Sequence, residues 1–266
     1  MNDTPIVCYL YTVFDNINSI INFKNHYQKF NSGYNHELII CFKLLNKYEI
    51  EKIVNEIKDL KFQIFIDDHE INDFDFGSYK RVSEKYIDKD IFFMNSHSYP
   101  ICDNWLKLLM NYKQKNNLIG ASGSYESMTN SIKLKKKYKI ISYLLKLYKF
   151  KKSFPNFPNP HLRTSSFLIN SKIFLEYIND KIIENKFDAW KIESGFQSLT
   201  NYFKFKNYDV LVVNSKGARF LENEWKLSHT YSYLNQDNLI ISDKHTRKYM
   251  IKSLDEKKDA TKIVWG

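Results

Sequence analysis

The sequence predicts an α/β fold with a mainly parallel β-sheet flanked by helices. Two observations support this fold class. Short apolar runs rich in β-branched and aromatic residues alternate, up to Ala121, with helical patterns of about 10–15 residues. The chain of 266 residues is also 43% hydrophobic, which supplies a sizeable core. Because strand–helix–strand units form right-handed crossovers, consecutive strands are expected to run parallel.

The elements of the first half follow from apolar runs and capping residues. Helices are expected at about residues 18–30, 47–60, 78–86 and 103–114. The helix signal is clearest after Asn46, an N-cap residue, because Ile50, Ile53 and Ile57 recur at helical spacing. Five strands buried on both faces are expected between the helices, at residues 6–11, 37–42, 62–66, 90–94 and 118–121.

The second half of the chain is less regular. Strands are expected at residues 167–169 and 210–213, and helices at 172–177 and 193–205. The region after Trp225 has little periodicity and is expected to be a wrap-around tail. Pro155, Pro158 and Pro160 exclude a helix between the two halves and indicate an ordered loop.

A basic segment separates the two halves. Lysines gather at both ends of residues 131–152, around an apolar stripe made of Ile140, Ile141, Leu144, Leu145, Leu147 and Tyr148. Such a basic amphipathic helix lies in an anionic membrane interface or docks on the protein as an ordinary surface helix, and both interpretations stay open. We expect one domain overall, with a first half at 1–130, the insertion at 131–157, and a second half with the tail at 158–266.

Composition and charge exclude several classes of protein. The net charge of +10 attracts polyanions such as nucleotide diphosphates, nucleic acids or an acidic membrane. A nucleic-acid partner is not expected, because no zinc-ligand spacing, RNP-like segment or basic recognition helix is present. A dinucleotide-dependent enzyme is not expected either, because Thr12-Val13-Phe14-Asp15 replaces a glycine-rich turn after the first strand.

The cysteines and the chain's apolar runs suggest where the protein works. Cys8 and Cys41 lie inside strand-like runs and no Cys-x-x-Cys pair exists, so buried free thiols in a reducing compartment are expected. No secretory signal opens the sequence, and no run reaches the roughly 18 apolar residues of a spanning helix. The expected location is the cytoplasm, with a peripheral position on the inner face of a membrane as a further expectation.

Ligands of parallel sheets bind outside the carboxyl ends of the strands. The polar residues that follow the predicted strands are therefore the first site candidates. They are Thr12, Asp67, Asp68, Asn95, Ser96 and His97.

The position of Asn95-Ser96-His97 after a buried strand, in this order of elements, resembles glycosyltransferases of the GT-A fold, which is Rossmann-like. The resemblance is to family-2-like members and spans about residues 5–217. It implies a nucleotide-sugar donor and a divalent cation, Mn or Mg, which neutralises charge on the leaving diphosphate. Asn95 stands where the family's D-x-D or D-x-H tripeptide has an acid, and His97 holds its third position. Asn95, His97 and a late histidine, His229, are the metal ligands that the resemblance implies, and a metal-free site using Lys and Arg is the alternative.

The resemblance also implies donor contacts upstream of this tripeptide. Asp75, Gly77, Lys80 and Arg81 would face the donor, with Gly77 at a positive φ and a helix N-terminus directed at phosphate. Asp67 and Asp68 would contact the nucleobase or ribose.

Downstream residues are implied to serve the acceptor and the chemistry. His161 and Arg163 would contact acceptor or phosphate, and Trp190 would stack on a sugar ring, with structural roles as the alternative. Glu193, placed at a helix start, would be the general base, with Asp188 in reserve and a helix-capping role for Glu193 as the alternative. The polar segment 243–247 is a further candidate to close over the site.

The predicted function is transfer of a sugar from a nucleotide-diphosphate donor to a glycan or lipid-linked acceptor. The alternative is a catalytically degenerate GT-A domain that binds sugar or a partner.

Overall fold

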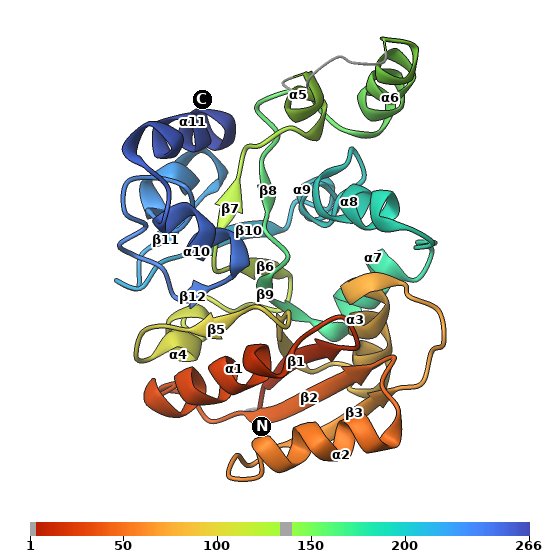
Figure 1. Cartoon of the computed structure of the whole chain (residues 1–266). Helices are drawn as coiled ribbons and strands as arrows, with labels where there is room; N and C mark the ends of the chain where they lie inside the picture. Colours follow the sequence, from red (N-terminus) through yellow and green to blue (C-terminus); the bar gives the residue numbers. More distant parts are fainter. Residues whose placement is uncertain (1–3, 134–139) are drawn as a thin grey trace.

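A computed structural model describes residues 4–133 and 140–266 of the chain. Its centre is an eight-stranded sheet in which the strands follow one another in the order β11-β10-β6-β9-β4-β1-β2-β3 (Figure 1). The strands are β1 (Ile6–Thr12), β2 (Glu37–Lys43), β3 (Gln63–Asp67), β4 (Asp90–Met94), β6 (Asn117–Gly120), β9 (Ser166–Asn170), β10 (Asp209–Val213) and β11 (Arg219–Phe220).

The sheet is mainly parallel, which confirms the predicted fold class. β1 pairs in parallel with β2 and β4, β2 with β3, and β6 with β10. β9 runs antiparallel to both β4 and β6, with Ser166 opposite Met94. The loop that enters β9 therefore lies at the carboxyl edge of β4, among the strand ends where ligands bind in such sheets.

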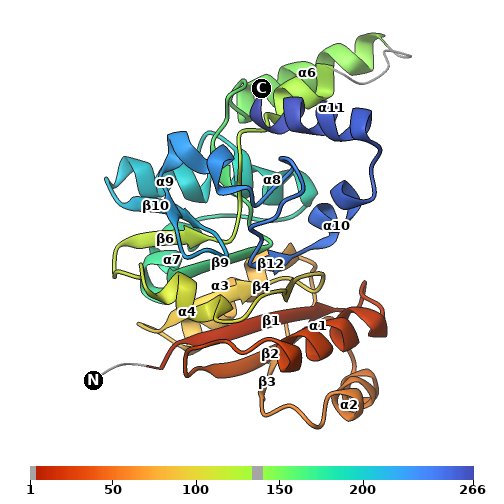
Figure 2. The ribbon, with the colours of Figure 1, turned by 90° about the vertical axis from the view of Figure 1, so that its left-hand side faces the viewer.

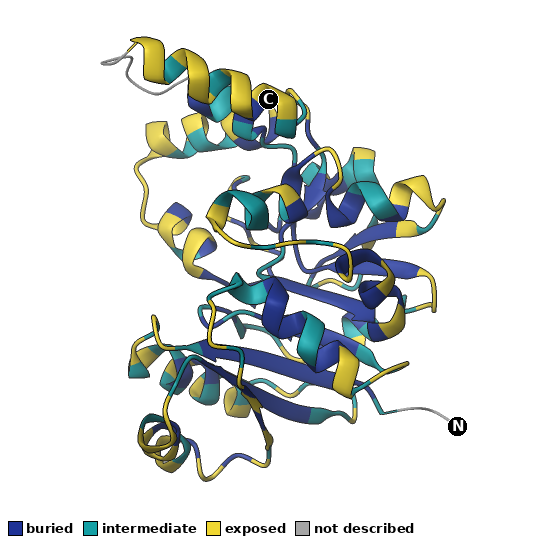
Figure 3. Cartoon of the chain, turned by 90° about the vertical axis from the view of Figure 1, so that its right-hand side faces the viewer, coloured by how far each residue is buried: buried dark blue, intermediate teal, exposed yellow. Residues whose placement is uncertain are grey.

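Helices cover both faces of the sheet and build two apolar cores. The helices of one face contribute Phe23, Ile53 and Trp105 to one core. The helices of the other face contribute Tyr79, Phe174 and Phe203 to the second core. One face is covered by α1 (Ile17–Lys29), α2 (Lys47–Glu56) and α4 (Trp105–Met110), and the other by α3 (Phe74–Lys85), α7 (Ser171–Ile178), α8 (Lys186–Ser194) and α9 (Leu199–Phe205). Figure 3 shows the strands buried and the outer sides of the helices exposed.

Two expectations for the second half are wrong. The single helix predicted at residues 193–205 is broken: α8 ends at Ser194, and Ser198 caps α9 by accepting a hydrogen bond from the Asn201 N–H. Glu193 therefore lies at the end of a helix, not at its start. The tail is also more regular than predicted. It forms η1 (Glu222–Ser228), β12 (Ile241–Ser242), α10 (Lys244–Met250) and α11 (Leu254–Trp265), and in Figure 2 α10 and α11 lie above the sheet, on the side away from the N-terminus.

The basic segment contributes α5 (Met128–Lys133) and α6 (Ile140–Ser153). The basic amphipathic helix expected at residues 131–152 includes residues 134–139, which lie outside the described part of the chain. Two short sheets join β12 to β5 (Tyr99–Pro100) and β7 (Gly123–Ser124) to β8 (His161–Leu162). Within the described residues, every helix is too short or too polar to cross a membrane. Cys8 and Cys41 are buried free thiols, as predicted.

Candidate functional site

Two adjoining cavities open at the carboxyl edge of the sheet. The strand-end cavity, of about 410 Å³, is lined by the ends of β1, β2 and β4 and by the start of α3. The loop cavity, of about 450 Å³, is lined by the loops around β8 and β9 and by α8 and α10. Asp75, Asn95 and Lys186 line both cavities, so the two spaces meet at these three side chains.

Asp15 organises the strand-end cavity. Its carboxylate accepts hydrogen bonds from the Thr12 N–H at 2.9 Å, the Thr12 hydroxyl at 2.7 Å and the Ser96 hydroxyl at 2.6 Å. The His97 Nε2 atom lies 3.7 Å from the same carboxylate. Burial lowers the pKa of His97 more than Asp15 raises it, so the imidazole is neutral near pH 7. Asp15 was not among the site candidates that the sequence indicated, because its contact with Ser96 depends on the pairing of β1 with β4.

The Asn95–His97 turn is held in place from several sides. The Asn95 Oδ1 atom accepts hydrogen bonds from the His97 N–H at 3.2 Å and the Ser98 hydroxyl at 2.7 Å. The Arg247 guanidinium of α10 donates to the His97 carbonyl at 3.0 Å. The tail thus contacts this strand end through Arg247, a residue of the segment 243–247.

The residues expected to hold a divalent cation do not form a metal centre. The Asn95 carbonyl oxygen already accepts two hydrogen bonds within its own turn. His229 lines neither cavity, and its ring packs against Tyr233 at 5.1 Å. Across the described ranges 4–133 and 140–266, no three His, Cys, Asp or Glu side chains gather as metal ligands would.

Asp67 lies outside both cavities, in a closed ion-pair network. Its buried carboxylate accepts from Arg81 Nε at 2.5 Å and Nη2 at 2.6 Å, and also from the Ser78 hydroxyl. Lys43 pairs with Asp73 and donates to the Phe74 carbonyl at 3.1 Å. Lys43 was missed from the sequence, although it ends β2 and lines the strand-end cavity.

Four further residues predicted to contact the donor lie elsewhere. Asp68 is exposed and lines neither cavity. Gly77, Lys80 and Arg81 line a separate cavity of about 340 Å³ between α3 and the end of α7.

Gly77 corrects a prediction about the backbone. It lies inside α3 and is absent from the described glycines with positive φ. A Cβ atom at this position would meet the Asp73 carboxylate at 1.9 Å. Glycine is therefore needed at position 77 because the Asp73 carboxylate, which the ion-pair network holds against the helix, leaves no room for a side chain. It is not needed for a turn that approaches a ligand.

Asp75 is the carboxylate at the junction of the two cavities. Burial raises its pKa to about 6, with Asp15 and Glu193 adding repulsion and Lys43 opposing it. A carboxyl group whose pKa lies near neutrality can take up and release a proton at physiological pH. Lys186, the other charged group at the junction, is exposed and lies 5.5 Å from the ring centre of Trp190.

The loop cavity brings together the residues that were predicted downstream. His161, Arg163, Trp190 and Glu193 all line it. One Glu193 oxygen accepts from the Thr164 N–H at 3.2 Å and the Thr164 hydroxyl at 3.1 Å.

The histidine and the arginine of this cavity are fixed differently. His161 lies with Nδ1 2.7 Å from the Asn159 carbonyl, so Nδ1 carries the proton and Nε2 is an acceptor in the neutral ring; burial lowers the pKa of His161. Arg163 is buried and pairs with Asp243 at 2.7 Å while stacking on Tyr231 at 3.8 Å. Burial raises the pKa of Asp243, but Arg163 and further hydrogen bonds outweigh it and hold the pKa well below its ordinary value.

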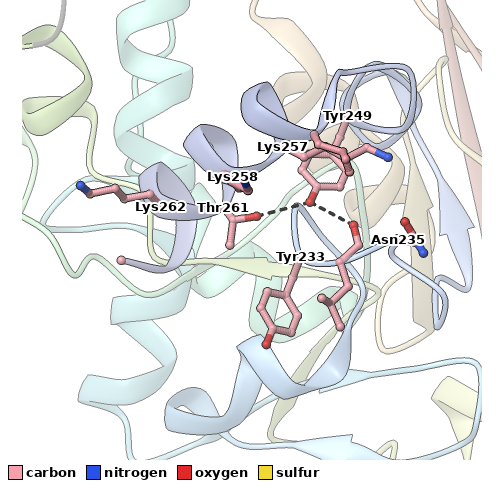
Figure 4. Close-up of a pocket in the computed structure, with 10 residues that line it drawn as sticks. Tyr233, Asn235, Tyr249, Lys257, Lys258, Thr261 and Lys262 are labelled. Carbon is pink, nitrogen blue, oxygen red and sulfur yellow. Dashed lines mark hydrogen bonds between the residues drawn. The ribbon is translucent and has the colours of Figure 1, made fainter.

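Two other cavities lie away from this edge. Asp188 pairs with Lys191 at 2.8 Å and lines a cavity of about 450 Å³ between α6 and α8, outside the loop cavity. A tail cavity of about 570 Å³ is formed by α10, α11 and the loop before β12 (Figure 4). The Tyr249 hydroxyl there donates to the Leu234 carbonyl at 3.0 Å, and none of the predicted site residues lines this cavity.

No protein-family model matches the chain, and no curated protein matches it by sequence. Several solved structures match it at low identity. The glycosyltransferase GlyE of Streptococcus pneumoniae TIGR4 matches at 11% identity and a TM-score of 0.46, over 100% of this chain and 65% of that chain. HddC from Yersinia pseudotuberculosis matches at 10% identity and a TM-score of 0.41, over 76% of this chain and 97% of that chain.

The galactosyltransferase LgtC, in complex with donor and acceptor sugar analogues, matches at 9% identity and a TM-score of 0.39. That match covers 70% of this chain and 69% of LgtC. At such identities and TM-scores these matches do not assign the chain to a family, and the chain spans slightly less than two thirds of GlyE.

Proposed function

We propose that this protein is a GT-A-type glycosyltransferase that moves a sugar from a nucleotide-diphosphate donor to a hydroxyl of a glycan or glycolipid. One observation carries the proposal: two cavities at the carboxyl edge of the sheet meet at a carboxylate and a lysine, Asp75 and Lys186. A transferase needs two substrate spaces that share one reaction point, and a group there that handles a proton.

The strand-end cavity suits the donor. Its polar floor of Thr12, Asp15 and Ser96 can bind hydroxyl groups, and Lys186 can neutralise the diphosphate. Because the side chains there do not fit a metal ion, no step of the proposed reaction passes through one. The loop cavity suits the acceptor, with Trp190 offering an aromatic face to a sugar ring.

In the proposed reaction, the acceptor hydroxyl oxygen bonds to the anomeric carbon as that carbon's bond to the diphosphate oxygen breaks. The hydroxyl proton passes to a carboxylate. We assign this role to Asp75, because it borders both substrates, whereas Glu193 lines only the loop cavity and has one oxygen bound to Thr164. Glu193 then orients the acceptor, a role different from the one that the sequence pattern suggested.

A second function, sugar binding without catalysis, is favoured by Asn95. It stands where the GT-A resemblance implies an acid, and its oxygen serves the local turn. Tight binding of a sugar nucleotide with no turnover would support this second function.

Release of nucleotide from UDP-, GDP- and dTDP-sugars tests the proposal. One donor is expected to turn over, and Asp75→Asn is expected to lower that turnover by about 100-fold or more. Asp68→Asn, on an exposed carboxylate outside both cavities, is the matched control and should leave turnover unchanged. Full turnover in Asp75→Asn together with its loss in Glu193→Gln would transfer the base role to Glu193.

A further inference from the structure

Helix α6 has one face packed on the protein and another face left uncovered. Phe150 is only 4% exposed and packs with Phe154 and Ile132. The apolar residues of the uncovered face are each more than half exposed. They are Ile140 (68%), Ile141 (77%), Leu144 (54%), Leu145 (66%) and Tyr148 (60%). Figure 3 shows α6 mainly in yellow, next to the grey trace. A contiguous exposed apolar face of this kind marks an interaction surface.

Most of the chain's net positive charge belongs to the stretch of sequence that contains α6. Residues 131–157 contain nine lysines and no acidic residue, so they account for nine of the ten net positive charges. Four of these lysines lie on α6, all exposed: Lys146, Lys149, Lys151 and Lys152.

We propose that α6 lies in the surface of an anionic lipid bilayer, with its uncovered apolar face inserted and its lysines at the headgroups. An exposed apolar face and exposed lysines on the same helix together favour an anionic bilayer as the partner. An apolar helix face gains from burial in the acyl region, and each nearby lysine gains from anionic headgroups. A second copy of the chain would bring a like-charged face against this one, which is unfavourable. Nucleic acid would use the lysines but would leave the apolar face uncovered.

Contacts between α6 and α8 connect this surface to the loop cavity. Phe150 packs against Phe187 and Trp190 of α8, with ring centres 5.1 Å and 6.3 Å apart. Lys149 lies 4.1 Å from the ring centre of Phe187. Trp190 in turn lines the loop cavity. The bilayer would thus lie close to the proposed acceptor space, which makes a lipid-linked acceptor the expected substrate class. This last step rests on the proposed function.

Co-sedimentation of the full chain with vesicles tests the membrane surface. We expect binding to vesicles of phosphatidylcholine with phosphatidylglycerol, and at least tenfold weaker binding to phosphatidylcholine alone. Ile141→Ser with Leu145→Ser should weaken binding to the anionic vesicles at least tenfold, because the inserted side chains are lost. Lys149→Glu with Lys152→Glu should weaken it similarly and remove the preference for anionic lipid.

The control variants lie on α2, at the end of the molecule opposite α6 (Figures 1 and 2). Tyr48→Ser removes an apolar ring that is as exposed as the side chain of Ile141. Lys47→Glu with Lys52→Glu changes the net charge by the same amount as Lys149→Glu with Lys152→Glu. Both should bind vesicles like the wild type. Equal vesicle binding by the α6 variants would overturn the proposal. So would a wild-type dimer that the Ile141→Ser, Leu145→Ser pair dissociates, or retention on nucleic acid in place of vesicles.

The acceptor step is tested separately. The Ile141→Ser, Leu145→Ser pair should lower transfer to a glycolipid held in anionic vesicles at least tenfold, while nucleotide release from the donor in solution stays unchanged. Unchanged transfer would overturn the lipid-linked acceptor. Absence of any donor turnover by the wild type would overturn the proposed function while the vesicle result stands by itself.

Discussion

Asp75, the proposed general base, combines burial with nearby negative charge. It shares its surroundings with Asp15 and Glu193, and only Lys43 opposes their repulsion. The same arrangement costs stability, because a carboxylate pays for being charged where water is scarce. Active sites commonly carry such a cost, since groups placed for reaction are not placed for stability.

This cost has a definite pH dependence. The folded protein binds the Asp75 proton more tightly than the unfolded chain does, because burial raises the pKa from 3.8 to about 6. Between these two values stability falls as pH rises, and above pH 6 the full cost is present. Asp75→Asn removes the charge. It is expected to raise the free energy of unfolding by about 1–2 kcal/mol above pH 6, after allowance for partial exposure.

Urea denaturation of this variant at pH 7.5 and pH 4 measures the effect. The gain should shrink towards zero at the lower pH, where the wild-type carboxyl is protonated in the folded protein and already about half protonated in the unfolded chain. Asp68→Asn is the control and should change little at either pH. A variant that is less stable than the wild type at pH 7.5 would show that Asp75 is held by favourable contacts as a carboxylate.

At the scale of elements, ion pairs fix α3 to the ends of two strands. Lys43 of β2 and Asp67 of β3 lie on strands, whereas Asp73 and Arg81 belong to the start and the body of α3. This network orients the first turn of α3, and that turn carries Asp75 towards the junction of the cavities.

Gly77→Ala tests how closely α3 and this network fit. Helix propensity alone predicts that alanine stabilises the helix by about 1 kcal/mol. The structure predicts the opposite sign, a loss of about 1–3 kcal/mol, because the new Cβ atom displaces the Asp73 carboxylate from Lys43 and Arg81. Urea denaturation measures the change, with Asn55→Ala on α2 as the control for propensity. A stabilised Gly77→Ala protein would contradict the close packing described here.

The strands could be predicted from local signals because each is a continuous apolar run. β1, β2, β3, β4, β6 and β10 all lie within a residue or two of the expected positions. Glu193, by contrast, was placed at a helix start because Gly195 and Ser198 were not recognised as a break between two helices. The helices of the tail were not predicted because local apolar signals are weak there. They begin with capping boxes at Asp243 and Ser253 and have little apolar periodicity.

The site depended on pairings that no local pattern contains. Thr12, Asn95, Ser96 and His97 could be predicted to lie together because strand ends of a parallel sheet converge, and all four line the strand-end cavity. Asp15 acts through Ser96, which is 81 residues away, and Arg163 is neutralised by Asp243 from the tail. Asp67 is bound by Arg81, whereas Asp75 lines two cavities. This difference follows from how α3 packs on the sheet, which the sequence pattern does not contain.

At the scale of the whole molecule, most of the net charge comes from residues that line neither of the two proposed substrate spaces. Outside residues 131–157 the chain is nearly neutral, with a net charge of only +1. The charge that sets the isoelectric point therefore comes mainly from the stretch of sequence that contains α6, the helix of the proposed membrane surface. The proposed donor space depends instead on a few placed groups, so donor binding and vesicle binding should respond to different substitutions.

Calorimetric titration of nucleoside diphosphates into variant proteins asks most directly whether the donor binds at the carboxyl edge of the sheet. Lys186→Ala, at the junction of the two cavities, should weaken binding about tenfold, or about 1.4 kcal/mol, with or without Mn. Lys258→Ala, in the tail cavity, should leave affinity unchanged. Full affinity in Lys186→Ala together with a loss in Lys258→Ala would place the nucleotide in the tail cavity and contradict the account.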